Sequence, residues 1–91
     1  MKTPSIHLNG TSGDELLTQV CDVVHGLNQA LDLMAKAAPH GRDYYVQGDD
    51  VFSQARREFD DRVKRIRSVL KEYEEIAMAV SDRRDERLTR L

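Results

Sequence analysis

The sequence lacks paired cysteines, long apolar runs and a strong net charge, and each absence excludes a class of protein. Cys21 is the only cysteine among 91 residues, so the chain forms no internal disulfide and fits a reducing cytoplasm. No apolar stretch approaches the roughly 20 residues of a membrane span, and residues 1–13 lack the apolar segment of a signal peptide. The net charge of −2 gives no overall field that attracts nucleic acid or anionic lipid.

Residues 12–38 are predicted to form a first helix. Ser12 and Glu15 have the spacing of a capping box at its start, and Pro39 and Gly41 stop it. An apolar seam runs along it at intervals of three and four residues: Leu17, Val20, Val24, Leu27, Leu31, Met34 and Ala38. A second apolar row repeats every seven residues: Leu16, Val23, Ala30 and Ala37. Together the rows form a stripe wider than one partner helix covers.

Residues 49–80 are predicted to form a second helix after a loop at 39–48. Its seam also advances by threes and fours: Phe52, Ala55, Phe59, Val63, Ile66, Leu70, Tyr73, Ala77 and Val80. Its polar positions place acids four residues before bases, in the order that stabilises a helix: Glu58/Arg62, Asp60/Lys64 and Asp61/Arg65. Residues 81–91 are predicted to be a polar helical extension, either continuous with this helix or restarting after it.

These elements predict one all-α domain over residues 1–91. Residues 1–11, with Pro4 and an Asn-Gly turn signal, form an extended arm, and the two helices fold into an antiparallel hairpin. A hairpin leaves the second apolar row uncovered, so we expect further copies to cover it. The predicted assembly is a homo-oligomer with a four-helix or larger core, formed by a dimer or a higher oligomer.

The segment His7–Ser12 is the first candidate ligand site. Asn9, Gly10, Thr11 and Ser12 lead directly into a helix N-terminus, where free amides and the positive end of the helix dipole favour phosphate. The hydroxyls add donors, although the spacing is not that of a P-loop. The alternative interpretation is an ordinary helix cap.

The loop segment His40–Tyr45 is the second candidate. Arg42 pairs bidentately with phosphate, and Tyr44 and Tyr45 offer flat faces for a base. His40 and Asp43 complete the candidate set. The alternatives are an ion pair or an Asx turn at Asp43 and simple packing of the tyrosines over the hairpin end. In an antiparallel dimer this loop would meet the first segment of the other copy and form a composite site.

The sequence predicts no enzyme, metal site or cofactor. His7, His25 and His40 lack metal-type spacing, and nothing near Cys21 activates its thiol as a nucleophile with His25. Seven basic residues crowd into 56–71, but acids interleave with them at salt-bridging offsets. That pattern favours a solvated helix face over a nucleic-acid surface.

The segments HLNGTS and HGRDYYVQG resemble a group of small, mostly uncharacterised proteins encoded by bacteriophages and prophages. The resemblance implies an accessory or counter-defence role in the cytoplasm of a bacterial host. Some such factors are oligomeric sponges that sequester nucleotide immune signals, as the anti-CBASS and anti-Thoeris sponges do, although their motifs are absent here. We therefore expect binding of a phosphate-bearing nucleotide-like ligand without turnover. The alternatives are an inhibitor or scaffold acting on a host protein through the helical surface, and a structural phage component.

Overall fold

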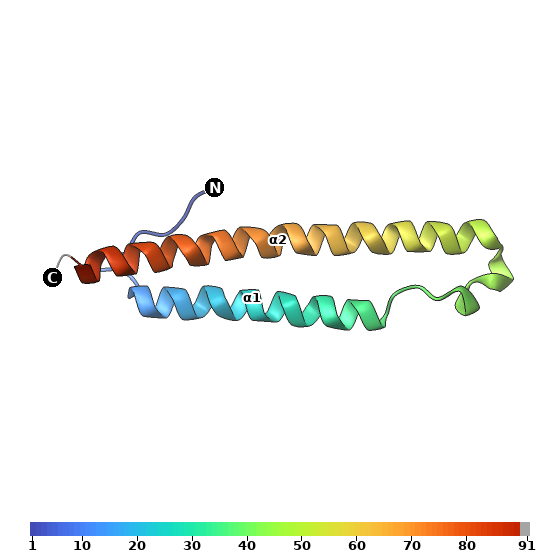
Figure 1. The fold of residues 1–91 in the computed structure, drawn as a ribbon, viewed down its shortest axis with the longest axis horizontal. Coiled ribbons are helices and arrows are strands. Elements are labelled where there is room, and N and C mark those ends of the chain that lie inside the picture. Colours follow the sequence, from blue (N-terminus) through green and yellow to red (C-terminus); the bar gives the residue numbers. More distant parts are fainter. Residues whose placement is uncertain (90–91) are drawn as a thin grey trace.

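The computed structural model describes residues 1–89, which form a helical hairpin (Figure 1). Helix α1 spans Gly13–Lys36 and helix α2 spans Asp49–Thr89. The end of α2 lies beside the start of α1, where Arg84 Nη1 and Asp14 Oδ1 form an ion pair at 3.3 Å. No strand occurs among the described residues. The predicted all-helical class and the hairpin are confirmed.

Helix α1 begins at its predicted cap. Ser12 Oγ accepts a hydrogen bond from the Glu15 N–H at 3.1 Å, which satisfies one of the free amides of the first turn. The helix ends at Lys36, shortly before the predicted end at residue 38, because Pro39 disfavours helical geometry in the residue that precedes it. The six seam residues within α1 are half-buried, and so is Ala38 just beyond its end.

Replacing the cap residue is expected to weaken α1. Ser12→Ala should lower the free energy of unfolding by about 1 kcal/mol, because the Glu15 amide loses its acceptor. Thermal unfolding followed by circular dichroism measures the effect, and Thr11→Ala is the matched control because Thr11 is exposed and precedes the cap. Equal melting temperatures for the two variants would show that the cap contributes nothing.

Helix α2 is one continuous helix of 41 residues, so residues 81–89 of the predicted extension belong to it, while residues 90 and 91 lie outside the described residues. Two of the predicted ion pairs form: Arg62–Glu58 at 3.9 Å and Arg65–Asp61 at 3.0 Å. Asp60 pairs instead with Arg56 at 3.6 Å, one turn earlier in the helix. Lys64 is therefore left without the partner that the sequence predicted for it.

The loop between the helices contains two short 3₁₀ turns, η1 (Gly41–Asp43) and η2 (Tyr45–Gln47). Gly48 then turns the chain into α2 with φ of 107° and ψ of 158°. This backbone conformation is essentially restricted to glycine. Gly48 therefore sets the direction in which α2 begins, and any other amino acid at this position would strain the backbone.

The N-terminal arm, residues 1–11, is bound to the end of α2 by arginine side chains. Arg83 donates to the Pro4 carbonyl oxygen, and Arg87 Nη1 donates to the Ile6 carbonyl oxygen at 3.0 Å. Gly13 is buried beneath this junction, and a Cβ there would lie 2.9 Å from Ile6 Cδ1 and 3.3 Å from Arg84 Cβ. The missing side chain of Gly13 thus lets the arm, α1 and α2 come together.

The hairpin has a thin core and an elongated shape. Leu70 and Val80 are its buried hydrophobic residues, and the other α2 seam residues are half-buried. The molecule measures 67 × 20 × 19 Å with a radius of gyration of 19.5 Å, whereas a globular domain of this length has about 12 Å. One copy therefore leaves most of its apolar seam partly open to solvent.

Candidate functional site

The two predicted ligand segments lie at opposite ends of the hairpin (Figure 1). The segment Asn9–Ser12 is next to the start of α1, and the loop His40–Tyr45 is at the far end of a molecule 67 Å long. One copy therefore does not bring them together. A composite site of these two segments requires a second copy.

The first segment forms a turn and a helix cap. The Gly10 N–H donates to the His7 carbonyl oxygen at 3.1 Å, and the Leu16 N–H donates to the Ser12 carbonyl oxygen at 2.9 Å. The Ser12 hydroxyl caps the helix, as described above, and Asp14 and Glu15 put negative charge into the first turn. Asn9 and Thr11 are exposed. These features support a helix cap, and the two carboxylates of the first turn disfavour a further anion at this end.

The loop segment is organised by hydrogen bonds around His40. Its Nδ1 accepts from the Arg42 N–H at 3.4 Å, and its carbonyl oxygen accepts from the Asp43 N–H at 3.0 Å. Tyr44 packs on Phe52 of α2, with ring centroids 6.1 Å apart and planes at 46°. Tyr44 therefore holds the loop against the helix, as one of the alternative interpretations had it.

Tyr45 has a different environment. Its side chain is 74% exposed and lines a cavity of about 390 Å³ together with Phe52 and Ser53 of α2 and the glycines at both ends of the loop, Gly41 and Gly48. Arg42 is exposed and makes no ion pair with any described residue. Tyr45 and Arg42 thus remain available to a ligand.

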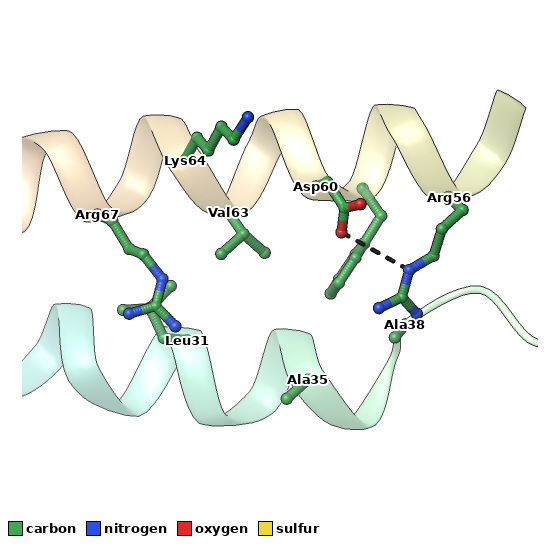
Figure 2. A pocket seen from close by; sticks show the side chains of 9 residues that line it. Leu31, Ala35, Ala38, Arg56, Asp60, Val63, Lys64 and Arg67 are labelled. Carbon is green, nitrogen blue, oxygen red and sulfur yellow. Dashed lines mark ion pairs between the residues drawn. The ribbon is translucent and has the colours of Figure 1, made fainter. Parts of the chain in front are cut away.

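A larger groove lies between the helices, one turn further along α2 (Figure 2). It has a volume of about 710 Å³, within the range of roughly 300–1,000 Å³ typical of small-molecule sites. Its apolar lining comes from both helices: Leu31, Ala35, Ala38, Phe59 and Val63. Its charged lining comes from α2: Arg56, Asp60, Lys64 and Arg67.

The cations of the groove are spread along its length. In Figure 2, Arg56 and Arg67 extend from α2 toward α1 on either side of Val63, whereas Lys64 points away from α1. Arg56 is engaged, with its guanidinium 5.6 Å from the Phe59 ring centroid and its Nε 3.6 Å from Asp60. Arg67 and Lys64 make no ion pair with another described residue. The groove therefore carries positive charge over an apolar floor.

The groove was not predicted from the sequence, because residues 56–71 were interpreted as one solvated face of the second helix. The pattern that marks it is the position of the bases relative to the seam. Arg56 precedes Val63 by seven residues and Arg67 follows it by four, so both lie on the seam side of α2. Bases at these offsets from an apolar seam border a groove, whereas Arg65 lies outside it and pairs with Asp61.

Groups that suit other chemistry are dispersed. Cys21 is an exposed free thiol. No three His, Cys, Asp or Glu side chains in the described part of the chain are grouped as metal ligands. No helix within residues 1–89 combines the length and apolar content that crossing a membrane requires.

Comparison of the chain with models of protein families, with curated proteins and with solved structures finds no match. The function is therefore inferred from the residues and the geometry of this chain.

Proposed function

We propose that this protein is a homo-oligomeric binding protein for a phosphate-bearing, nucleotide-like ligand, which it holds without turnover. The observation that carries the proposal is the groove of about 710 Å³ in which Arg56 and Arg67 flank an apolar floor. Guanidinium groups bind phosphate with two parallel hydrogen bonds, and an apolar floor accepts a base.

The groove and the loop cavity are separate hollows near this end of the hairpin, and the proposed ligand uses both. Ser53 of the cavity and Arg56 of the groove are three residues apart in α2, or about 4.5 Å along the helix axis. Arg56 and Arg67 are 11 residues apart, or about 16 Å along the helix. This spacing suits a ligand with two separated anionic groups, with Tyr45 providing an exposed ring for stacking beside them.

The biological setting comes from the resemblance of the HLNGTS and HGRDYYVQG segments to phage proteins. On that basis we extend the proposal to a counter-defence role, in which antiparallel hairpins assemble around a four-helix core and sequester a nucleotide signal. The thin core of a single hairpin supports assembly, because further burial of its half-buried seam residues would lower the free energy of the assembled state.

A ligand screen tests this proposal directly. Thermal shift and calorimetry with cyclic dinucleotides, cyclic trinucleotides and ADP-ribose-type molecules should identify a compound that raises the melting temperature, because a ligand at 100 times its Kd stabilises by about 2.7 kcal/mol. Arg67→Ala should weaken that ligand about 10- to 100-fold, since a charge-assisted hydrogen bond contributes about 1.5–3 kcal/mol. Chromatography after incubation should return the ligand intact.

The matched control is Arg65→Ala, which removes an arginine that faces Asp61 outside the groove. It should leave affinity within about twofold, because Arg65 does not line the groove, and its exposed ion pair contributes less than about 1 kcal/mol to folding. Equal losses in the two variants would contradict the groove as the site. If no nucleotide binds and a host protein co-purifies with the chain, the inhibitor or scaffold function replaces this proposal.

A further inference from the structure

We infer that one flank of the hairpin, the Val69 flank, is the contact surface for a second antiparallel copy of this chain. The Val69 flank is defined by these residues: Leu16, Val23 and Ala30 of α1, Ala37 at its C-cap, and Val69 and Ile76 of α2. This inference names the surface and the partner of the assembly proposed above, and it does not depend on the identity of the ligand.

The flank lies on the side of the hairpin opposite the groove. Met34 and Arg62 line a small cavity on this side, which shares no residue with the groove. Ala30 and Ala37 neighbour Met34 on the helix surface, and Val69 follows Arg62 by two turns. The second apolar row of α1 and the apolar residues of α2 therefore lie on a common side of the molecule.

This side is more open to solvent than the seam. Val23 is 37% exposed and Val69 is 39% exposed, although both are large β-branched residues. The flank also presents the small side chains of Ala30 and Ala37, which let another helix approach closely. An open row of valines and alanines on one side of a hairpin has the composition of a helix–helix contact.

The surface area of the chain indicates that a second copy is the occupant. The accessible surface is 7066 Å² for a chain of 10.4 kDa, about 1,700 Å² more than a folded monomer of this mass exposes. A standard interface buries about 800 Å² on each partner, and obligate homodimers bury more. A standard contact would remove about half of this excess, and a contact of the obligate homodimer class along the hairpin would remove it all.

The position of the flank favours antiparallel pairing with full overlap. Val69 is the central residue of α2, since Asp49–Thr89 has 20 residues on either side of it. A two-fold axis that passes near Val69 and is perpendicular to the hairpin places the second copy alongside the first over its full length, in the opposite direction. The segment Asn9–Ser12 of one copy then lies at the same end as the loop His40–Tyr45 of its partner, while both grooves stay uncovered.

A charge on the flank should break the dimer. In sedimentation equilibrium or light scattering at defined concentrations, the wild-type chain should have twice the mass of one copy, and Val69→Glu should raise the dissociation constant at least 100-fold. Met78→Glu is the matched control, because Met78 is also on α2 and is 67% exposed, but lies outside the flank. A monomeric wild type, or a larger loss in Met78→Glu, would overturn the inference.

Cross-linking tests the direction in chains whose flank is intact, so it does not depend on whether Val69→Glu folds. In a Cys21→Ser background, Thr11→Cys chains are mixed with Tyr45→Cys chains and treated with a short bismaleimide. The antiparallel dimer should give the mixed product. Exclusive Tyr45→Cys homodimers would show parallel pairing, and the absence of all products would show that the ends do not overlap; either result overturns the inference. Failure of the ligand screen leaves both readouts unaffected.

Discussion

Val80→Asp is expected to unfold the hairpin at room temperature. Val80 has no exposed surface, and it lies one helical turn before Arg84, at the junction where the N-terminal arm, α1 and α2 meet. The substitution loses about 1.5–3 kcal/mol of apolar burial and adds the cost of burying an unpaired carboxylate. A total above about 4 kcal/mol approaches the whole stability of a small domain.

Circular dichroism and urea unfolding measure this effect, and Met78→Asp provides the control. Met78 is two residues earlier on the same helix and is 67% exposed, so its replacement should cost less than about 1 kcal/mol. If Val80→Asp unfolds cooperatively with the same urea midpoint as the wild type, Val80 is not buried as described. Similar losses in the two variants would show that helix propensity, not burial, sets the cost.

Gly48→Ala is expected to destabilise the loop end of the molecule. The backbone at Gly48, with φ of 107° and ψ of 158°, is strained for any residue with a Cβ. The expected cost is about 1–3 kcal/mol, although no atom lies within 4 Å of the new methyl group. The loss would therefore come from backbone geometry alone, and denaturant unfolding would report it as a lower midpoint.

Gly26→Ala is the matched control with the opposite expected sign. Gly26 is an exposed residue inside α1, and no atom lies within 4 Å of its added methyl group either. Alanine should stabilise the helix there by up to about 1 kcal/mol, because glycine is a poor helix former. If both substitutions shift the unfolding midpoint in the same direction, the strain at Gly48 does not govern the loop.

The parts of the fold set by local pattern were predictable from the sequence. The seams, whose residues recur every three or four positions, gave both helices, and Ser12 with Glu15 predicted the start of α1. The separation of the two ligand segments also followed from hairpin geometry. In each case the information lies within a few turns of one helix, where spacing alone determines which residues share a face.

The features that depend on distant contacts were not predictable. The pattern of apolar residues stops near Ser81, so the sequence left open whether the second helix continues or restarts there; α2 continues, and Arg83 and Arg87 donate to carbonyl oxygens of the arm. The partner of Asp60 was predicted wrongly for a local reason, because bases lie four residues on either side of it, Arg56 and Lys64, and spacing alone does not choose between them; Arg56 lies over the Phe59 ring and pairs with Asp60. The groove depends on how the two helices face each other, which neither seam specifies by itself.

The elongated shape of the molecule has a consequence for how it moves in solution. Dimensions of 67 × 20 × 19 Å describe a rod with an axial ratio above three. Such a rod experiences more friction than a sphere of equal mass, so a single 10.4 kDa chain elutes from a sizing column ahead of compact proteins of its mass. Side-by-side pairing of two rods doubles the mass while adding thickness rather than length. Dimerisation should therefore change the sedimentation coefficient more than it changes the maximum dimension seen by X-ray scattering.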